Sequence, residues 1–158
     1  MRRLVSLMDR GLAWGCVVLT LALVGCVIWQ VFSRYVLGKP STVTDEMARF
    51  LFIWVGLLGA AYTLGHRRHL AMDFLLSSSK GRKRVVLWRL VDSISLFFAA
   101  VVMVYGGSRL VEKTLSVGQL SPALSLEMGW VYTAVPLSGV CMCLYLFHEF
   151  LLPVKDQQ

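Results

Sequence analysis

Four long apolar stretches without an ionisable side chain constrain this sequence more than any other feature. Asp, Glu, Lys, Arg and His are all missing from residues 16–32, 50–65, 93–108 and 132–147. With its apolar flanks, each stretch approaches the roughly 20 residues that a helix needs to cross a bilayer. The sequence therefore predicts an all-α integral membrane protein with four transmembrane helices. We expect these spans at about 12–37, 43–65, 85–107 and 129–152.

The spans and their connections use nearly all of the 158 residues, so we expect a single membrane domain, 1–158, without a soluble catalytic domain. Only 16% of the residues are charged, against about a quarter in soluble domains. A net charge of +7 raises the question of nucleic acid binding. The basic residues lie beside the apolar stretches, however, so membrane topology explains them better and no nucleic acid partner is expected.

The distribution of Lys and Arg predicts the orientation of the spans. Eleven of the 16 Lys and Arg residues lie in the N-terminal tail, between the second span and the start of the third, or after the fourth. Since cytoplasmic loops carry the excess of positive charge, both termini are predicted to be cytoplasmic, in a bacterial inner membrane. Residues 23–26, Leu-Val-Gly-Cys, are similar to a lipoprotein cleavage site. The sequence stays apolar afterwards, so we interpret this segment as part of an uncleaved first span.

Residues 69–84 are predicted to form a short amphipathic segment on the cytoplasmic surface, between the second and third helices. Leu, Met and Phe residues come first, and four basic residues follow: Lys80, Arg82, Lys83 and Arg84. Basic amphipathic segments bind anionic lipid headgroups, so these four are candidate contacts with membrane lipids. Contact with a partner subunit is the alternative.

The apolar centres of the spans argue against an independent transporter. Ionisable residues inside the membrane usually mark ion paths or substrate sites, and secondary transporters tend to contain repeats and paired broken helices. Here one span carries a proline, Pro136, which is predicted to kink the fourth helix. A self-sufficient four-span exporter would also need an acid embedded in its first span. We do not expect this chain to transport a solute alone.

Cofactor, metal and catalytic sites are not expected either. His66, His69 and His148 fall at predicted helix ends, whereas haem ligands need facing positions inside a bundle. The four cysteines lie in apolar stretches, where Cys mostly behaves as a small hydrophobic residue. No nucleophile–base pair or glycine-rich phosphate loop stands out in the sequence. Enzymatic activity is therefore not predicted.

The remaining polar residues lie near the predicted span ends. Asp45, Glu46 and Arg49 can share one helical face, because residues three or four apart are neighbours on a helix. Arg34, at the end of the preceding span, is expected to reach the same acids. This group is either an intramolecular clasp or a surface that a partner recognises. Residues 42–45, Thr-Val-Thr-Asp, also resemble a helix capping box.

A second pair of charges is predicted inside the membrane boundary. Arg89 and Asp92 are three residues apart near the start of the third span. A lone carboxylate at that depth would be costly, so we expect the two side chains to neutralise each other in a structural ion pair.

Two blocks of sequence resemble a known family. The first consists of FSRY (32–35), TDEMARFLFIW (44–54), LGAA (58–61) and HLAMD (69–73). The second consists of QLSPAL (119–124), MGWVY (128–132) and Pro136. In order and spacing they are similar to the small membrane subunit, of DctQ type, of tripartite ATP-independent periplasmic (TRAP) transporters. One departure is Val43, where the family often has an aromatic residue.

The resemblance implies a function within a larger assembly. In that family a large membrane subunit carries the substrate and sodium sites and moves by an elevator mechanism. A periplasmic protein captures the substrate, typically an organic acid. The small subunit acts as a scaffold and helps to dock the binding protein. Asp45, Glu46 and Arg49 match the family's acidic pair and arginine, which implies a role in assembly or docking. A stand-alone structural or lipid-interacting membrane protein is the alternative.

Overall fold

The computed structural model describes residues 2–66 and 82–150, and both ranges are almost entirely helical. The elements are α1 (Arg2–Tyr35), α2 (Thr42–His66), α4 (Arg82–Phe97), η1 (Phe98–Gly106), α5 (Gly107–Val117), α6 (Met128–Tyr132) and α7 (Ala134–Phe150). Within these ranges, four helical segments are long and apolar enough to cross a membrane: Val5–Tyr35, Thr42–His66, Arg89–Val117 and Met128–His148. The predicted all-α fold with four spans is confirmed.

Two helices extend well beyond the predicted spans. α1 begins at Arg2 rather than near residue 12, and the third helical rod continues past residue 107 to Val117. Charged residues mark the edge of the hydrocarbon layer, but they do not end a helix. The rod ends where Gly118 adopts a left-handed conformation, with φ of +65°. The N–H groups of Gly118 and Gln119 then bond to carbonyls of the last turn, which is a common glycine C-cap.

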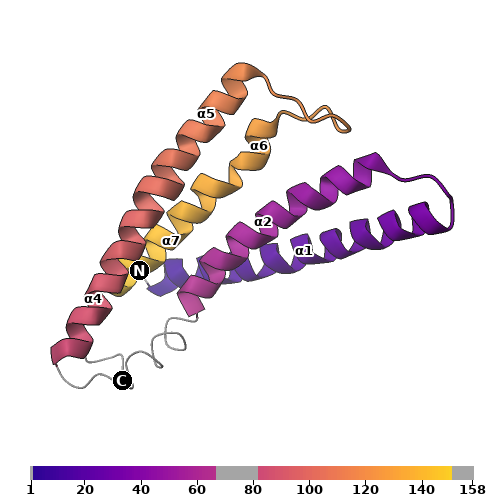
Figure 1. The fold of residues 1–158 in the computed structure, drawn as a ribbon. Coiled ribbons are helices and arrows are strands. Elements are labelled where there is room, and N and C mark those ends of the chain that lie inside the picture. Colours follow the sequence, from indigo (N-terminus) through magenta and orange to yellow (C-terminus); the bar gives the residue numbers. More distant parts are fainter. Residues whose placement is uncertain (1, 67–81, 151–158) are drawn as a thin grey trace.

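The helices form two hairpins (Figure 1). α1 and α2 make the first hairpin, and the continuous rod α4–η1–α5 packs against α6 and α7 in the second. α2 and α7 join the hairpins near one end, which we call the closed end. The connections 36–41 and 118–127 lie at the other end, which we call the open end because the hairpins diverge towards it. Asp9, near the start of α1, contacts Tyr145, near the end of α7, at the closed end.

An apolar core holds the closed end together. Leu12 of α1, Leu58 of α2 and Tyr145 of α7 are buried against one another. The hydroxyl of Tyr145 donates a hydrogen bond to the carboxylate of Asp9. Gly65 lies so close to the Tyr145 ring that a β-carbon there would be 2.7 Å from Cε1. This core therefore depends on one aromatic ring that contacts both helices of the first hairpin.

Small residues hold the second hairpin together. Gly139 of α7 faces η1, and a β-carbon on it would lie 2.7 Å from Cβ of Met103. Gly129 of α6 faces Leu115 in the same way, and Ala99, Ala134 and Ser138 are almost fully buried. Small residues let helix backbones approach closely in a membrane, where apolar burial gives little drive for association. The rod and the α6–α7 helix are therefore in direct contact along much of their length.

The fourth span is interrupted near Pro136. α6 ends at Tyr132 and α7 begins at Ala134, so Pro136 lies in the first turn of α7. Proline is tolerated there because an amide hydrogen is not needed for the first turn of a helix. The N–H of Leu137 donates to the carbonyl of Thr133, 3.1 Å away. The interruption thus falls one turn before Pro136.

Candidate functional site

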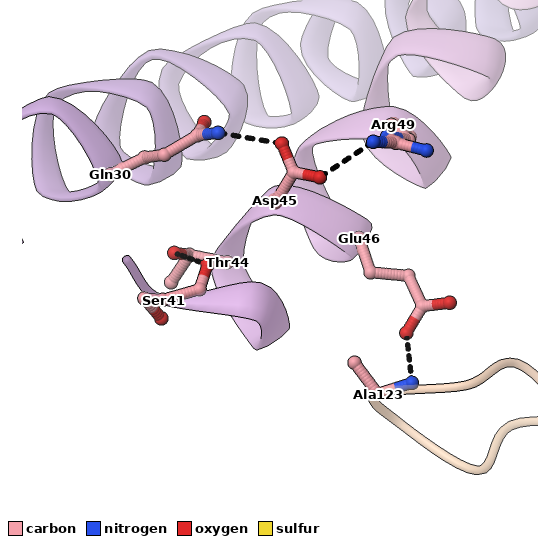
Figure 2. A network of polar contacts seen from close by, with 7 residues as sticks. All are labelled: Gln30, Ser41, Thr44, Asp45, Glu46, Arg49 and Ala123. Carbon is pink, nitrogen blue, oxygen red and sulfur yellow. Dashed lines mark hydrogen bonds and ion pairs between the residues drawn. The ribbon is translucent and has the colours of Figure 1, made fainter. Parts of the chain in front are cut away.

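Asp45 connects the two helices of the first hairpin at the open end (Figure 2). One carboxylate oxygen accepts a hydrogen bond from Nε2 of Gln30 on α1, at 2.6 Å, and the other accepts one from Nη2 of Arg49, at 2.7 Å. Asp45 and Arg49 are one turn apart on α2 and form an ion pair. Asp45 therefore links α1 to α2, as an intramolecular clasp would.

Arg34 does not take part in this clasp. It is exposed, and among the described residues the structure shows no ion pair between Arg34 and either acid. Gln30, one turn earlier on α1, occupies the place that the sequence suggested for Arg34. The one signal for Gln30 in the sequence is that it is the single amide side chain in the apolar stretch 16–32.

The capping-box interpretation of residues 42–45 is wrong for the Asp45 side chain. Its carboxylate is bonded to Gln30 and Arg49 rather than turned back to the start of α2. Instead, the carbonyl of Ser41 accepts hydrogen bonds from the Asp45 N–H, at 3.2 Å, and from Oγ1 of Thr44, at 3.1 Å. The start of α2 leaves the Asp45 carboxylate free to face α1.

Glu46 points towards a different partner. Its Oε2 atom accepts hydrogen bonds from the backbone N–H groups of Ala123, at 2.8 Å, and Leu124, at 2.9 Å. Both donors belong to the 118–127 connection of the second hairpin, which lies below Glu46 in Figure 2. The two adjacent acids therefore make different contacts. Asp45 connects the two helices of the first hairpin, and Glu46 connects the first hairpin to the second. Backbone donors give no signal in a sequence, so this contact was not predicted.

The 118–127 connection has a defined structure of its own. The N–H of Ser121 donates to the carbonyl of Leu126, at 2.8 Å, and the N–H of Met128 donates to the carbonyl of Gln119, at 2.9 Å. The Ser121 side chain is buried, and its Oγ accepts from the N–H of Leu124. Ser125 adopts a left-handed conformation, with φ of +52°, where the chain reverses. Glu46 therefore binds a folded turn.

An apolar groove lies beside the Asp45–Arg49 pair, between α1 and α2. Its volume is about 400 Å³, and the two charged residues are among those that line it. The apolar lining is Leu23, Val27, Ala48, Phe52 and Ile53. Such a surface suits an apolar neighbour within the membrane better than a polar solute.

The remaining predicted residues lie on or near α4. Arg89 is exposed and Asp92 is half-buried, one turn apart, and their mutual neutralisation stays a prediction. α4 begins at Arg82, so Arg82, Lys83 and Arg84 form its first turn. Lys80 and the predicted amphipathic segment up to residue 81 lie outside the described residues. Contact of these four basic residues with lipid stays a prediction.

The outward-facing surface of the spans is apolar. Trp14, Leu21 and Phe52 are each about two-thirds or more exposed. In the part of the chain that the structure describes, no three His, Cys, Asp or Glu side chains gather as metal ligands would. The fold and the site together define a multi-pass membrane protein in which the described side-chain hydrogen bonds between different elements lie near helix ends.

Comparison with known proteins identifies the family. The family model of the DctQ component of tripartite ATP-independent periplasmic transporters matches residues 23–156. The chain belongs to this family, whose members are transporter components.

Three relatives illustrate the family's range. The chain is 30% identical to the isethionate TRAP transporter permease protein DctMQ of Oleidesulfovibrio alaskensis, over 82% of this chain and 21% of that protein. It is 25% identical to the sialic acid TRAP transporter small permease protein SiaQ of Vibrio cholerae, over 77% of this chain and 68% of SiaQ. It is 29% identical to the C4-dicarboxylate TRAP transporter small permease protein DctQ of Rhodobacter capsulatus, over 63% of this chain and 43% of that protein. The chain thus spans about a fifth of DctMQ and two-thirds of SiaQ.

Proposed function

We propose that this chain is a scaffold subunit that supports a large, elevator-type membrane subunit in a TRAP transporter. The observation that carries the proposal is the use of the two acids at the open end. Asp45 and Glu46 are both bonded to groups of this chain, which stabilises its shape. The span centres hold no ionisable side chain that could bind an ion or a polar solute. Such a chain is suited to supporting a moving subunit.

The large membrane subunit is proposed as the main partner. The relative DctMQ supports this pairing, because the stretch similar to this chain makes up about a fifth of that longer permease. Fusion into one polypeptide would keep a small and a large membrane subunit together. The apolar groove between α1 and α2 and the exposed apolar side chains offer surfaces that a second membrane protein or lipids would cover.

The transported solute is proposed to be an organic acid, taken up with sodium ions through sites on the large subunit. The relatives described above are named for isethionate, sialic acid and C4-dicarboxylates, all of which are organic anions. A periplasmic binding protein would deliver the solute to the open end, where this chain helps to dock it. This arrangement requires both termini to be cytoplasmic in the inner membrane, as the distribution of Lys and Arg along the sequence supports.

Purification and reconstitution test the proposal. A tagged chain, extracted in mild detergent, should bring down a large hydrophobic protein in stoichiometric amounts. Liposomes with both proteins should take up the solute when the binding protein and a sodium gradient are supplied, and liposomes with this chain alone should not. Uptake by this chain alone, or its purification without any membrane partner, would contradict the proposal. The second result would favour the stand-alone alternative.

Charge reversal at the Asp45–Arg49 pair separates a clasp from a partner contact. Asp45→Arg and Arg49→Asp each place like charges one turn apart, so each should reduce uptake. The double variant restores an ion pair and should recover part of the uptake. Because an exposed pair of this kind contributes about 0.3–0.5 kcal/mol, all three variants should remain folded in a thermal unfolding assay. A folded double variant as inactive as the single ones would show that the ion pair is not what uptake needs, and would favour recognition of the Asp45 carboxylate by Gln30 or by a partner.

A further inference from the structure

The two hairpins are joined by different forces at their two ends. At the closed end Leu12, Leu58 and Tyr145 form a continuous apolar core. At the open end the helices diverge, as Figure 1 shows, and the 118–127 connection extends from the second hairpin towards the first. Near the open end the helices of the two hairpins touch between α2 and α6, but this contact is small compared with that of α2 and α7. We therefore infer that helix packing alone does not set the separation of the hairpins there.

Glu46 provides the polar connection across this opening. Its carboxylate oxygen accepts hydrogen bonds from two consecutive backbone N–H groups, those of Ala123 and Leu124. Consecutive N–H groups in a turn form a concave site that favours an anion, and charge-assisted hydrogen bonds are the stronger kind. For the described residues, the other hydrogen bonds that we observe at the open end stay within one hairpin.

The bound turn can transmit this constraint to the helices. Gly118 caps the end of α5, and the N–H of Met128, the first residue of α6, bonds back to Gln119. The turn is thus fixed to both α5 and α6 by short-range hydrogen bonds. The hydrogen bonds from residues 123 and 124 to Glu46 therefore also restrict the positions of the adjoining ends of α5 and α6.

We propose that Glu46 is a positioning residue that sets the separation of the two hairpins at the open end. Its carboxylate acts through the 118–127 turn, not through recognition by another protein. The distance between hairpins is a property of this chain alone. Its importance for uptake rests on the proposed function of the chain as a scaffold.

Substitutions that separate side-chain length from charge test the proposal. Gln keeps the length of Glu and a carbonyl oxygen that can accept both hydrogen bonds, so Glu46→Gln should keep most of the wild-type geometry. Asp keeps the charge but is one methylene shorter, so Glu46→Asp should lose the contact as fully as Glu46→Ala. Recognition of the charge by a partner predicts the reverse order, with Asp tolerated and Gln not.

The distance between hairpins is the direct measurement. Spin labels at Val36→Cys and Leu126→Cys, two exposed positions on opposite hairpins, report it when the four native cysteines are replaced. The full-length chain is measured in lipid nanodiscs, with and without its co-purified partner. We expect a narrow distance distribution for wild type and Glu46→Gln. Glu46→Asp and Glu46→Ala should give a broader one, shifted to longer distances.

Glu112→Ala is the matched control. Glu112 is an exposed carboxylate on α5 that pairs with Arg109 on its own helix, 3.7 Å away, so its removal should leave the distance unchanged. Unchanged distances in Glu46→Ala, or wild-type distances in Glu46→Asp together with broad ones in Glu46→Gln, would overturn the proposal. Uptake is then measured for the same variants. Altered distances with wild-type uptake would support Glu46 as a positioning residue and count against the scaffold function instead.

Discussion

Replacing Gly139 with leucine should separate α7 from η1 and destabilise the protein strongly. A β-carbon at this position would lie 2.7 Å from Cβ of Met103 and 3.1 Å from the backbone nitrogen of Val104. Neither atom can rotate away, because one is the first side-chain atom and the other is backbone. Overpacking of a close-packed contact costs about 1–3 kcal/mol. We expect a lower midpoint of thermal unfolding in detergent, measured by intrinsic tryptophan fluorescence.

Gly56→Leu is the matched control for this prediction. Gly56 lies within α2, and a β-carbon there would meet no atom within 4 Å. Leucine also has a higher helix propensity than glycine, by about 1 kcal/mol. Gly56→Leu should therefore leave the unfolding midpoint unchanged or raise it. Equal midpoints for the two variants would contradict the close contact between α7 and η1.

Tyr145→Ala should give the second large effect, because it removes the ring on which the closed end depends. Truncation of a buried aromatic residue costs about 3–5 kcal/mol. The Tyr145 ring packs with Leu12 and Leu58, and its hydroxyl donates to Asp9. We expect a much lower unfolding midpoint. Tyr145→Phe keeps the ring and should lose only the smaller contribution of the hydrogen bond.

A double-mutant cycle with Gly65 isolates the packing contribution. A β-carbon at Gly65 would collide with the Tyr145 ring, so Gly65→Ala should destabilise the wild-type protein. In the Tyr145→Ala background the space is empty, and alanine should stabilise α2 by about 1 kcal/mol through helix propensity. The effect of Gly65→Ala on stability should therefore change sign between the two backgrounds, which would show that Gly65 and Tyr145 interact. The same effect of Gly65→Ala in both backgrounds would show that these residues are not in contact.

The number and order of the spans could be predicted from the sequence, but the helix ends could not. Stretches without charged residues identify the helical segments that can lie in the hydrocarbon layer of a membrane, and they located all four spans. The third span was predicted to end near residue 107, whereas the helix continues as α5 to Val117. A helix can continue past its apolar stretch and still pack against its neighbour, as α5 does against α6. Gly118 was the better signal for the end of this helix.

The candidate site was predictable only where its contacts are local. Asp45 and Arg49 form the pair that their spacing suggested. Gln30 was missed because an uncharged amide gives a weak signal, and Arg34 was expected in its place. The contact between Glu46 and residues 123 and 124 joins segments 77 and 78 residues apart through backbone donors. Periodicity says nothing about such a contact, and neither does side-chain type.

The length of α1 has a consequence for the membrane around this protein. Its 34 residues extend about 51 Å at 1.5 Å per residue, whereas the hydrocarbon core of a bilayer is about 30 Å thick. A helix that exceeds the bilayer tilts or projects into water, and its tilt changes with bilayer thickness. α1 carries one half of the open end, so a thinner bilayer should increase its tilt and press that half towards the membrane plane. Lipid chain length would then act on the geometry of this protein without binding at any site.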